Sequence, residues 1–338
     1  MITLLAGGVG AARLLRGLAR AVPASALTVV VNTADDDEFY GLHVSPDIDT
    51  ILYTLAGLAP IERGWGIEDD SFAVRAELDK VAGPGWFALG DRDLATHIRR
   101  TERLRAGATL SEVTAELAVA RGVKVRVLPM CDEPVRTFVT TDKGDLAFQE
   151  YLVRRRARPR VRAVRFRGVR SSRPAPGVLD AIASSSLVLL APSNPFVSLG
   201  PILAVPGIRK ALRGVRERVV AVSPLIAGRA VKGPLASMLR AMGSRPDVSA
   251  IAALYRDIAT TLVVAHGDTP ASEPPRGMTI VEHDILLLDP ARAEALARFL
   301  LDRARTPKSG ASQSRVRSTL PARSRGRARG PAARSRTS

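Results

Sequence analysis

The chain has 338 residues, a formal net charge of +17 and a single cysteine, Cys131. That length can bury a full hydrophobic core, and a lone cysteine excludes an intramolecular disulfide framework. Eleven Lys and Arg side chains and no acid lie in 303–338, so +17 less eleven leaves +6 on residues 1–302. The four histidines lack the spacing of a zinc site, and four prolines break the most apolar stretch, 187–208, which excludes a transmembrane helix there.

The chain opens with a short apolar run, 2–5, followed by Gly7, Gly8 and Gly10 and then by a helical pattern. Strand, glycine turn and helix open many nucleotide-binding α/β units, in which backbone N–H groups at the helix N-terminus receive a phosphate. Arg13 stands where the dinucleotide pattern requires a third glycine, which disfavours NAD, and no Gly-Lys-Ser/Thr follows for a P-loop. A plain tight turn is the alternative.

A second apolar run, 27–31, ends in an acidic stretch, 32–57. Besides Glu38 this stretch carries five aspartates: Asp35, Asp36, Asp37, Asp47 and Asp49. Polar residues at the end of a buried parallel strand lie where α/β proteins bind ligands, and oxygen-rich sites suit Mg²⁺ rather than zinc. Ser45 and Pro46 predict the start of a helix, with the Ser45 side chain as its cap. A solvated acidic loop is the alternative.

Further polar turns follow predicted strands. Residues 86–89 predict a strand that delivers Gly90-Asp91-Arg92-Asp93 to the same crevice, although either aspartate could simply cap the next helix. Predicted strands at 187–191 and 219–222 are followed by hydroxyl, amide, glycine and lysine groups: Ser193, Asn194, Ser223, Lys232 and Gly233. If the sheet is parallel, these groups form a second anion site facing the first glycine turn; ordinary turn chemistry is the alternative.

The remaining segments predict less specific features. Residues 135–140 and 146–153 alternate around a turn and predict a hairpin, and the basic stretch 154–173 is typical of a solvated face or sheet edge. Residues 303–338 lack hydrophobic periodicity and predict a disordered basic tail, which could contact nucleic acid only nonspecifically. The N-terminus lacks the basic region of a signal peptide, so we expect a cytoplasmic protein with no membrane partner.

Seven segments, in one order along the chain, carry a family resemblance: GGVGAARLLRGL (7–18), NTADDDEFYGLHVSPDIDTILYTLAG (32–57), WFALGDRDLATHIRRT (86–101), LPMCDEPVRTFVTT (128–141), FQEYLV (148–153), LAPSNPFVSLGPILAVPGIR (190–209) and SPLIAGRAVKGP (223–234). Together they resemble the 2-phospho-L-lactate transferase family (CofD) of coenzyme F-420 biosynthesis, which includes bacterial phosphoenolpyruvate transferases. The glycine turn of that family usually reads GGTGGAK, and Val9, Ala11 and Arg13 here replace its Thr, last Gly and Lys.

The resemblance implies a reaction and a fold. A phospho-acid, 2-phospho-L-lactate or phosphoenolpyruvate, passes from lactyl- or enolpyruvyl-diphosphoguanosine to the ribityl hydroxyl of the deazaflavin FO, and GMP is released. The implied cofactor is Mg²⁺, and the implied assembly is a homodimer. The implied fold is α/β, a Rossmann-like parallel sheet with helices on both faces and a smaller inserted subdomain. We expect one domain over 1–302, with the smaller part near 68–169.

Residues carried over by motif become the site candidates. The catalytic candidates are Asp49, Asp36 and Asp91. The FO-binding candidates are Asp49, Arg92 and His43. The candidates for donor and phosphate binding are Gly8, Gly10, Ser193, Asn194, Lys232 and Gly233. The metal candidates are Asp35, Asp36 and Asp47.

Two other classes of function stay open. A nonenzymatic CofD-like regulator that binds nucleotide sugars would share the glycine turn and a related acidic motif. The GDRDLAT, PSNP and KGP motifs favour the transferase, whereas a bound nucleotide sugar would favour the regulator. Nucleic-acid binding is the third class, and it rests on the tail alone.

Overall fold

A seven-stranded parallel sheet organises the residues that the computed structural model describes, 1–230, 233–268 and 270–305. The strand order is β14-β13-β10-β9-β1-β2-β5, and every neighbouring pair is parallel. The strands are β1 (Ile2–Ala6), β2 (Leu27–Val31), β5 (Arg126–Pro129), β9 (Leu187–Leu190), β10 (Val219–Val222), β13 (Thr261–Val264) and β14 (Thr279–Glu282). The central strands are short runs of Val and Leu buried on both faces, as a covered parallel sheet requires.

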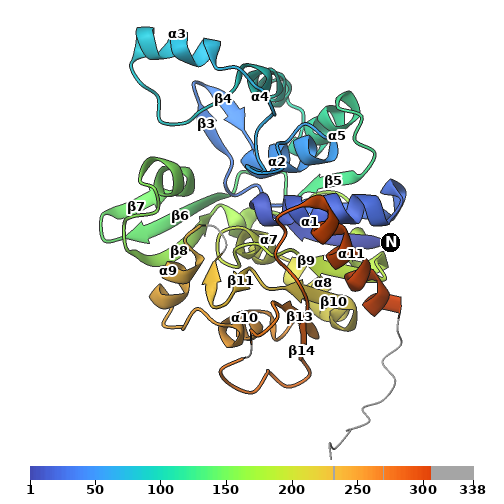
Figure 1. The fold of residues 1–338 in the computed structure, drawn as a ribbon. Coiled ribbons are helices and arrows are strands. Elements are labelled where there is room, and N and C mark those ends of the chain that lie inside the picture. The colour runs from blue at the N-terminus through green and yellow to red at the C-terminus, as the bar shows by residue number, and fades with distance from the viewer. Residues whose placement is uncertain (231–232, 269, 306–338) are drawn as a thin grey trace, which may run out of the picture. The chain divides into compact units, whose positions relative to one another are not determined.

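Helices cover both faces of this sheet (Figure 1), which confirms the predicted α/β class. Alternate strand residues point to opposite faces, so Leu4 packs into one core cluster and Leu5 into the other. The first cluster includes residues of α1 (Gly8–Ala21), α2 (Pro46–Leu55), α5 (Leu110–Ala120) and α11 (Pro290–Arg305). The second includes residues of α6 (Val178–Ser184), α7 (Leu199–Ala204), α8 (Ile208–Gly214), α9 (Leu235–Ala241) and α10 (Val248–Tyr255).

Smaller antiparallel sheets are added to this framework and confirm the predicted inserted subdomain. One sheet has the order β7-β6-β8: β6 (Arg136–Thr141), β7 (Gly144–Ala147) and β8 (Val161–Arg167). The pair β6–β7 confirms the predicted hairpin, but residues 148–153, expected in its second strand, are helical. The two-stranded pairs are β3 (Asp37–Phe39) with β4 (Leu42–Val44) and β11 (Leu225–Ile226) with β12 (Arg229–Ala230). The remaining elements are α3 (Ala73–Ala82), α4 (Asp91–Arg105), a π-helical turn Glu150–Arg154, and 3₁₀ turns at Ala24–Ala26, Val169–Ser171 and Arg216–Arg218.

The range 68–169, in which we expected the smaller part, also contains β5. This strand pairs with β2 and forms an edge of the main sheet, so the added structure is not one continuous segment. The predicted tail, 303–338, begins inside α11, and from residue 306 onward it lies outside the described residues.

Two further local predictions are wrong. Residues 86–89 form a loop instead of a strand, because their aromatic side chains pack against the β3–β4 hairpin: the ring centroids of Phe87 and Phe39 are 3.8 Å apart and the rings are stacked. Ser45 makes no side-chain cap for α2. Its hydroxyl donates instead to Oδ2 of Asp36, at 2.7 Å.

Parallel strands bring their carboxyl ends to one edge of the sheet. The chain leaves β1 for β2 on one side, and β9 pairs with β1 on the other side, so the strand order reverses at β1. Such reversal points form the ligand crevices of open α/β sheets. Among the described helices, none is long and apolar enough to cross a membrane.

Candidate active site

A cavity of about 560 Å³ lies at this edge of the sheet. Part of its wall follows directly on the strands: Gly7 after β1, Pro192 after β9 and Ser223 after β10. A second part, which we call the aromatic wall, consists of Tyr53, Trp65, Trp86 and Phe87. A third part is mostly apolar: Pro224, Ile226, Leu235, Ile285 and Leu287. The cavity therefore combines polar groups at the strand ends with an apolar surface that suits flat rings.

The glycine turn packs tightly against the loop after β9. A Cβ on Gly10 would lie 2.3 Å from the Pro192 carbonyl oxygen, and a Cβ on Gly7 would lie 2.7 Å from Cβ of Ser198. Gly8 has φ +70, a conformation that favours glycine. Its N–H, the first of α1, donates to Oδ1 of Asp47 at 2.8 Å. An acid from α2 thus occupies the helix N-terminus that we expected to face phosphate.

Asp35 and Asp47 form a buried pair of carboxylates on the cavity wall, which we call the strand-end pair. Asp47 also accepts a hydrogen bond from Nδ2 of Asn32 at 2.9 Å. Burial and the nearby acids Asp36 and Asp49 raise the pKa of Asp47 to about 6, against the hydrogen bonds from Asn32 and Gly8. Burial and the charge of Asp47 raise the pKa of Asp35 well above its usual value.

Buried carboxylates of this kind suit a cation. Oδ1 of Asp35 is buried and has no hydrogen-bond partner among the described residues, and the same is true of Oδ1 of Asp36. Two acids that raise one another's pKa repel when both are ionised, and a divalent cation relieves that repulsion. The donor set is all oxygen, which fits Mg²⁺.

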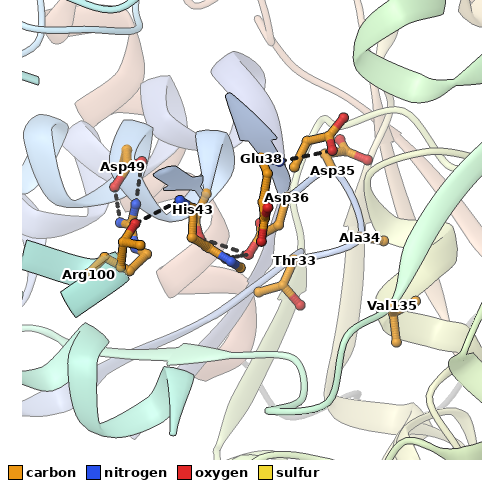
Figure 2. Close-up of polar contacts among 12 residues, drawn as sticks. Thr33, Ala34, Asp35, Asp36, Glu38, His43, Asp49, Arg100 and Val135 are labelled. Carbon is orange, nitrogen blue, oxygen red and sulfur yellow. Dashed lines mark hydrogen bonds and ion pairs between the residues drawn. The ribbon is translucent and has the colours of Figure 1, made fainter. Parts of the chain in front are cut away.

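A second acidic group lies on α2 and α4, and we call it the helix cluster: Asp49, Asp93, His97 and Arg100. Arg100 is fully buried and holds both carboxylate oxygens of Asp49, with Nη1 3.1 Å from Oδ2. Figure 2 shows this ion pair. Burial lowers the pKa of Arg100, but the charge and hydrogen bonds of Asp49 outweigh it and raise the pKa overall.

Asp93 and His97 extend this cluster. His97 Nε2 lies 3.1 Å from Oδ1 of Asp93, and the Tyr53 hydroxyl donates to the same oxygen at 2.5 Å. Burial raises the pKa of Asp93, but His97 and Tyr53 outweigh that effect and lower it overall. Ligand atoms of Asp49, Asp93 and His97 lie within 4.8 Å of one another, so this group could hold a metal ion.

Asp36 and His43 contact each other, as Figure 2 shows, and neither lines the cavity. Oδ2 of Asp36 lies 3.0 Å from His43 Nε2 and accepts the Ser45 hydroxyl. These contacts tie the acidic loop to the β3–β4 hairpin. We had grouped Asp36 and His43 with Asp49, but the structure pairs Asp36 with His43 and Asp49 with Arg100.

Asp91 and Arg92 also stay outside the cavity wall. Asp91 accepts hydrogen bonds from the Ser71 hydroxyl at 2.6 Å and from the N–H groups of Ala73 and Val74 at 2.9 and 3.0 Å, so it caps α3. These hydrogen bonds lower its pKa. The Arg92 side chain is exposed and donates to the Glu68 carbonyl at 3.1 Å.

Most donor-binding candidates do line the cavity. The described ones on its wall are Gly8, Gly10, Ser193, Asn194 and Gly233. The Ser193 hydroxyl donates to the Gly7 carbonyl at 2.7 Å, which joins the two anion-site turns. Lys232 lies outside the described residues.

Sequence reasoning missed the partners of Asp49. Asp93, His97 and Arg100 are spaced four and three residues apart, so they share one face of α4. Charged residues that share a face with the apolar residues of a helix indicate a buried polar site, and the sequence of α4 shows this pattern. Tyr53, Trp65 and Trp86 gave no comparable signal, because isolated aromatic residues are common in cores.

The family is settled by comparison with known proteins. The family described as "2-phospho-L-lactate transferase CofD" matches residues 2–298. The chain belongs to this family. A phosphoenolpyruvate transferase of Kitasatospora aureofaciens is 47% identical over 260 residues, which cover 75% of this chain and 81% of that protein. A 2-phospho-L-lactate transferase of Methanospirillum hungatei is 38% identical over 303 residues, covering 90% of this chain and 100% of that protein.

A solved structure agrees with the fold. A UPF0052 family protein of Bacillus halodurans has a TM-score of 0.57 at 17% identity, covering 89% of this chain and 99% of that chain. At that identity the likeness concerns the fold alone. The family match favours a transferase of the CofD type over a nonenzymatic regulator.

Proposed function

We propose that this chain transfers 2-phospho-L-lactate or phosphoenolpyruvate from its diphosphoguanosine donor to the ribityl hydroxyl of FO. The hydroxyl oxygen attacks the phosphorus next to the acid moiety, the bond from that phosphorus to the GMP oxygen breaks, and GMP leaves. The family is one of CofD transferases, and relatives carry both phospho-acid names.

One observation carries the proposal: a single cavity joins an aromatic wall, the glycine turn after β1, the Ser193-Asn194 loop after β9 and buried carboxylates. FO has a flat tricyclic ring, which the aromatic wall suits. The donor has a diphosphate. Asp47 already accepts the N–H of Gly8, so the turn after β1 offers the diphosphate close approach at Gly8 and Gly10 and the later N–H groups of α1, and the loop after β9 offers Ser193 and Asn194. We assign donor contact to Gly8, Gly10, Ser193, Asn194 and Gly233, with Lys232 as a further candidate. His43 and Arg92, candidates for FO, are supported by the family motif alone.

We propose that Mg²⁺ is held by the strand-end pair, Asp35 and Asp47, with Asp36 beside them. The buried Oδ1 atoms and raised pKa values support this placement over the helix cluster, in which Arg100 already neutralises Asp49. When bound, Mg²⁺ neutralises charge on the diphosphate oxygens and the departing phosphate.

Asp49 is our choice for the residue that touches the attacking hydroxyl. It lines the cavity beside Tyr53 of the aromatic wall, and its pairing with Arg100 fixes its position and keeps it available as an acceptor. Phosphoryl transfer through a loose transition state depends on positioning more than on a strong base. We assign Asp36 a supporting role beside the metal, since Ser45 holds its Oδ2, and Asp91 the structural role of capping α3.

The test is to incubate the purified chain with FO, Mg²⁺ and each donor in turn and to follow products by mass spectrometry. We expect a phospho-acid ester of FO together with GMP. Excess EDTA should abolish the product, and its addition after the reaction serves as the control. Absence of product with both donors, while the protein is folded, would reject the proposal.

We further propose a cytoplasmic homodimer, an assembly that the family resemblance supports. Light scattering of the purified chain measures its mass directly. A mass of one chain at assay concentration would contradict the dimer.

A further inference from the structure

Arg13 is the only Lys or Arg side chain among the described residues that line the cavity. It projects from α1, one turn beyond Gly8 and Gly10 of the glycine turn. Its Nη2 donates to the carbonyl of Glu62 at 2.8 Å, and its Nε is buried without a hydrogen-bond partner. No carboxylate of the described residues forms an ion pair with it.

Apart from Arg13, the charged side chains on the described cavity wall are acidic. Four carboxylates line the wall: Asp35, Asp47, Asp49 and Asp93. An anionic ligand entering such a cavity is repelled unless cations face it. A guanidinium offers a planar fork of N–H donors that matches phosphate or carboxylate oxygens, and Arg13 has donors left for such a group.

Arg13 also contacts a loop that carries part of the aromatic wall. We call residues 57–66 the Trp65 loop. A Cβ on Gly64 of this loop would lie 2.6 Å from Cγ1 of Val9 and 3.8 Å from Nε of Arg13, so the loop packs closely on that face of α1. Arg16, on the same face, donates to the carbonyl of Ala59 at 2.6 Å. Unlike Arg13, Arg16 does not line the cavity.

We propose that Arg13 binds an anionic group of the diphosphate donor and, through the Glu62 carbonyl, links donor binding to the position of the Trp65 loop. The proposal rests on the proposed function, because it takes the donor to be a guanosine diphosphate derivative. One end of the guanidinium holds the loop, and the other meets the anion. Donor binding thereby fixes a side chain, Trp65, that faces the acceptor's part of the cavity.

The experiment compares Arg13→Met with Arg16→Met, since both lose an arginine that holds the Trp65 loop and only the first loses a cavity cation. The probe is GDP with Mg²⁺, measured by calorimetry. Loss of a charge-assisted hydrogen bond predicts GDP binding weaker by about tenfold to a hundredfold in Arg13→Met. Arg16→Met should stay within about threefold of the unaltered protein, and Arg13→Lys should recover part of the loss.

Tryptophan fluorescence supplies the second readout. Only Trp65 and Trp86 are present in the chain, and both line the cavity. GDP should change the emission of these tryptophans in the unaltered protein and in Arg16→Met. In Arg13→Met, no such change should occur, even at a GDP concentration that saturates Arg13→Met. Equal GDP affinity in Arg13→Met and Arg16→Met, or an emission change that survives in Arg13→Met, would overturn the inference. If the unaltered protein itself fails to bind GDP and to form product, the proposed function has failed instead.

Discussion

The strand-end pair and the helix cluster are both acidic and both buried on the wall of one cavity, yet their charge is balanced in opposite ways. In the helix cluster, Arg100 holds both oxygens of Asp49, and the pKa of Asp93 is lowered. In the strand-end pair, burial raises both pKa values, and the charge of Asp47 raises that of Asp35 further. The first group has its counter-charge within the chain, whereas no Lys or Arg of the described residues forms an ion pair with the second, in keeping with the proposed Mg²⁺.

This difference separates two kinds of chemical task. An acid held at both oxygens by a fixed arginine keeps one position, which suits a group that orients a substrate. Acids without a protein counter-charge change affinity for a cation or proton easily, which suits a metal site. Substitutions in each acidic group separately test whether one group orients the substrate and the other binds the metal.

The largest effect is expected for Asp49→Asn. This change leaves Arg100 buried without its counter-charge, and an unpaired buried ion costs about 3–5 kcal/mol of stability. Thermal melts with and without ligands measure the loss. The double variant Asp49→Asn with Arg100→Met removes both charges and should recover most of the lost stability.

Turnover of the double variant then separates the two roles of Asp49. If Asp49 orients the FO hydroxyl, turnover should stay down by about a hundredfold or more in spite of the recovered fold. If Asp49 serves only to neutralise Arg100, turnover should return with stability, and our assignment of the carboxylate is wrong.

A smaller change in stability is expected when Mg²⁺ binds to the strand-end pair. Metal at about ten times its dissociation constant should add about 1.4 kcal/mol of stability near pH 7.5, seen as a higher Tm. Asp47→Asn should abolish that increase. Without metal, the variant loses one of two repelling charges but also one of the hydrogen bonds from Gly8 and Asn32, so each protein's Mg²⁺-induced rise is measured against its own metal-free Tm.

The pH dependence has a defined sign. The pKa of Asp47 is raised to about 6 in the folded chain, so its contribution to stability is present at low pH and is lost as pH rises through about 6. Protons compete with the metal below that value, so the Mg²⁺-induced rise in Tm should shrink below about pH 6. A rise that is independent of pH, or that persists in Asp47→Asn, would place the metal elsewhere, with the helix cluster next in order.

The sequence predicted the framework because periodicity and composition report burial directly. Short apolar runs such as 27–31 gave the strands, and glycines gave the turn after β1. The strand predicted at 86–89 failed because its aromatic residues serve a local cluster with Phe39, and composition alone cannot tell a sheet neighbour from a loop neighbour.

The site was predicted less completely than the fold, because the role of each acid depends on the side chain with which it pairs. The sequence shows that Asp36, Asp47 and Asp49 are close along the chain, but it does not show which partner each acquires. Arg100, fifty-one positions from Asp49, decides the role of that acid, and His43 with Ser45 decides the role of Asp36. Long-range contacts of this kind follow from topology and not from local spacing.

The smallest effect is expected at Asp91, which the sequence grouped with the catalytic acids. Its carboxylate caps α3, and Asp70 caps α4 in return by accepting the N–H groups of Arg92 and Asp93 at 2.8 and 3.1 Å. Asp91→Ala should therefore lower Tm slightly and leave turnover within about a factor of two. Because hydrogen bonds lower the pKa of Asp91, the difference in Tm should be present at neutral pH and vanish as pH falls through that pKa. The matched variant Asp70→Ala removes the cap of the helix that carries Asp93 and His97, so it should reduce turnover more than Asp91→Ala does. A large loss of turnover in Asp91→Ala with unchanged Tm would mean that Asp91 contacts substrate. Asp91 would then belong to the active site, alongside the strand-end pair and the helix cluster.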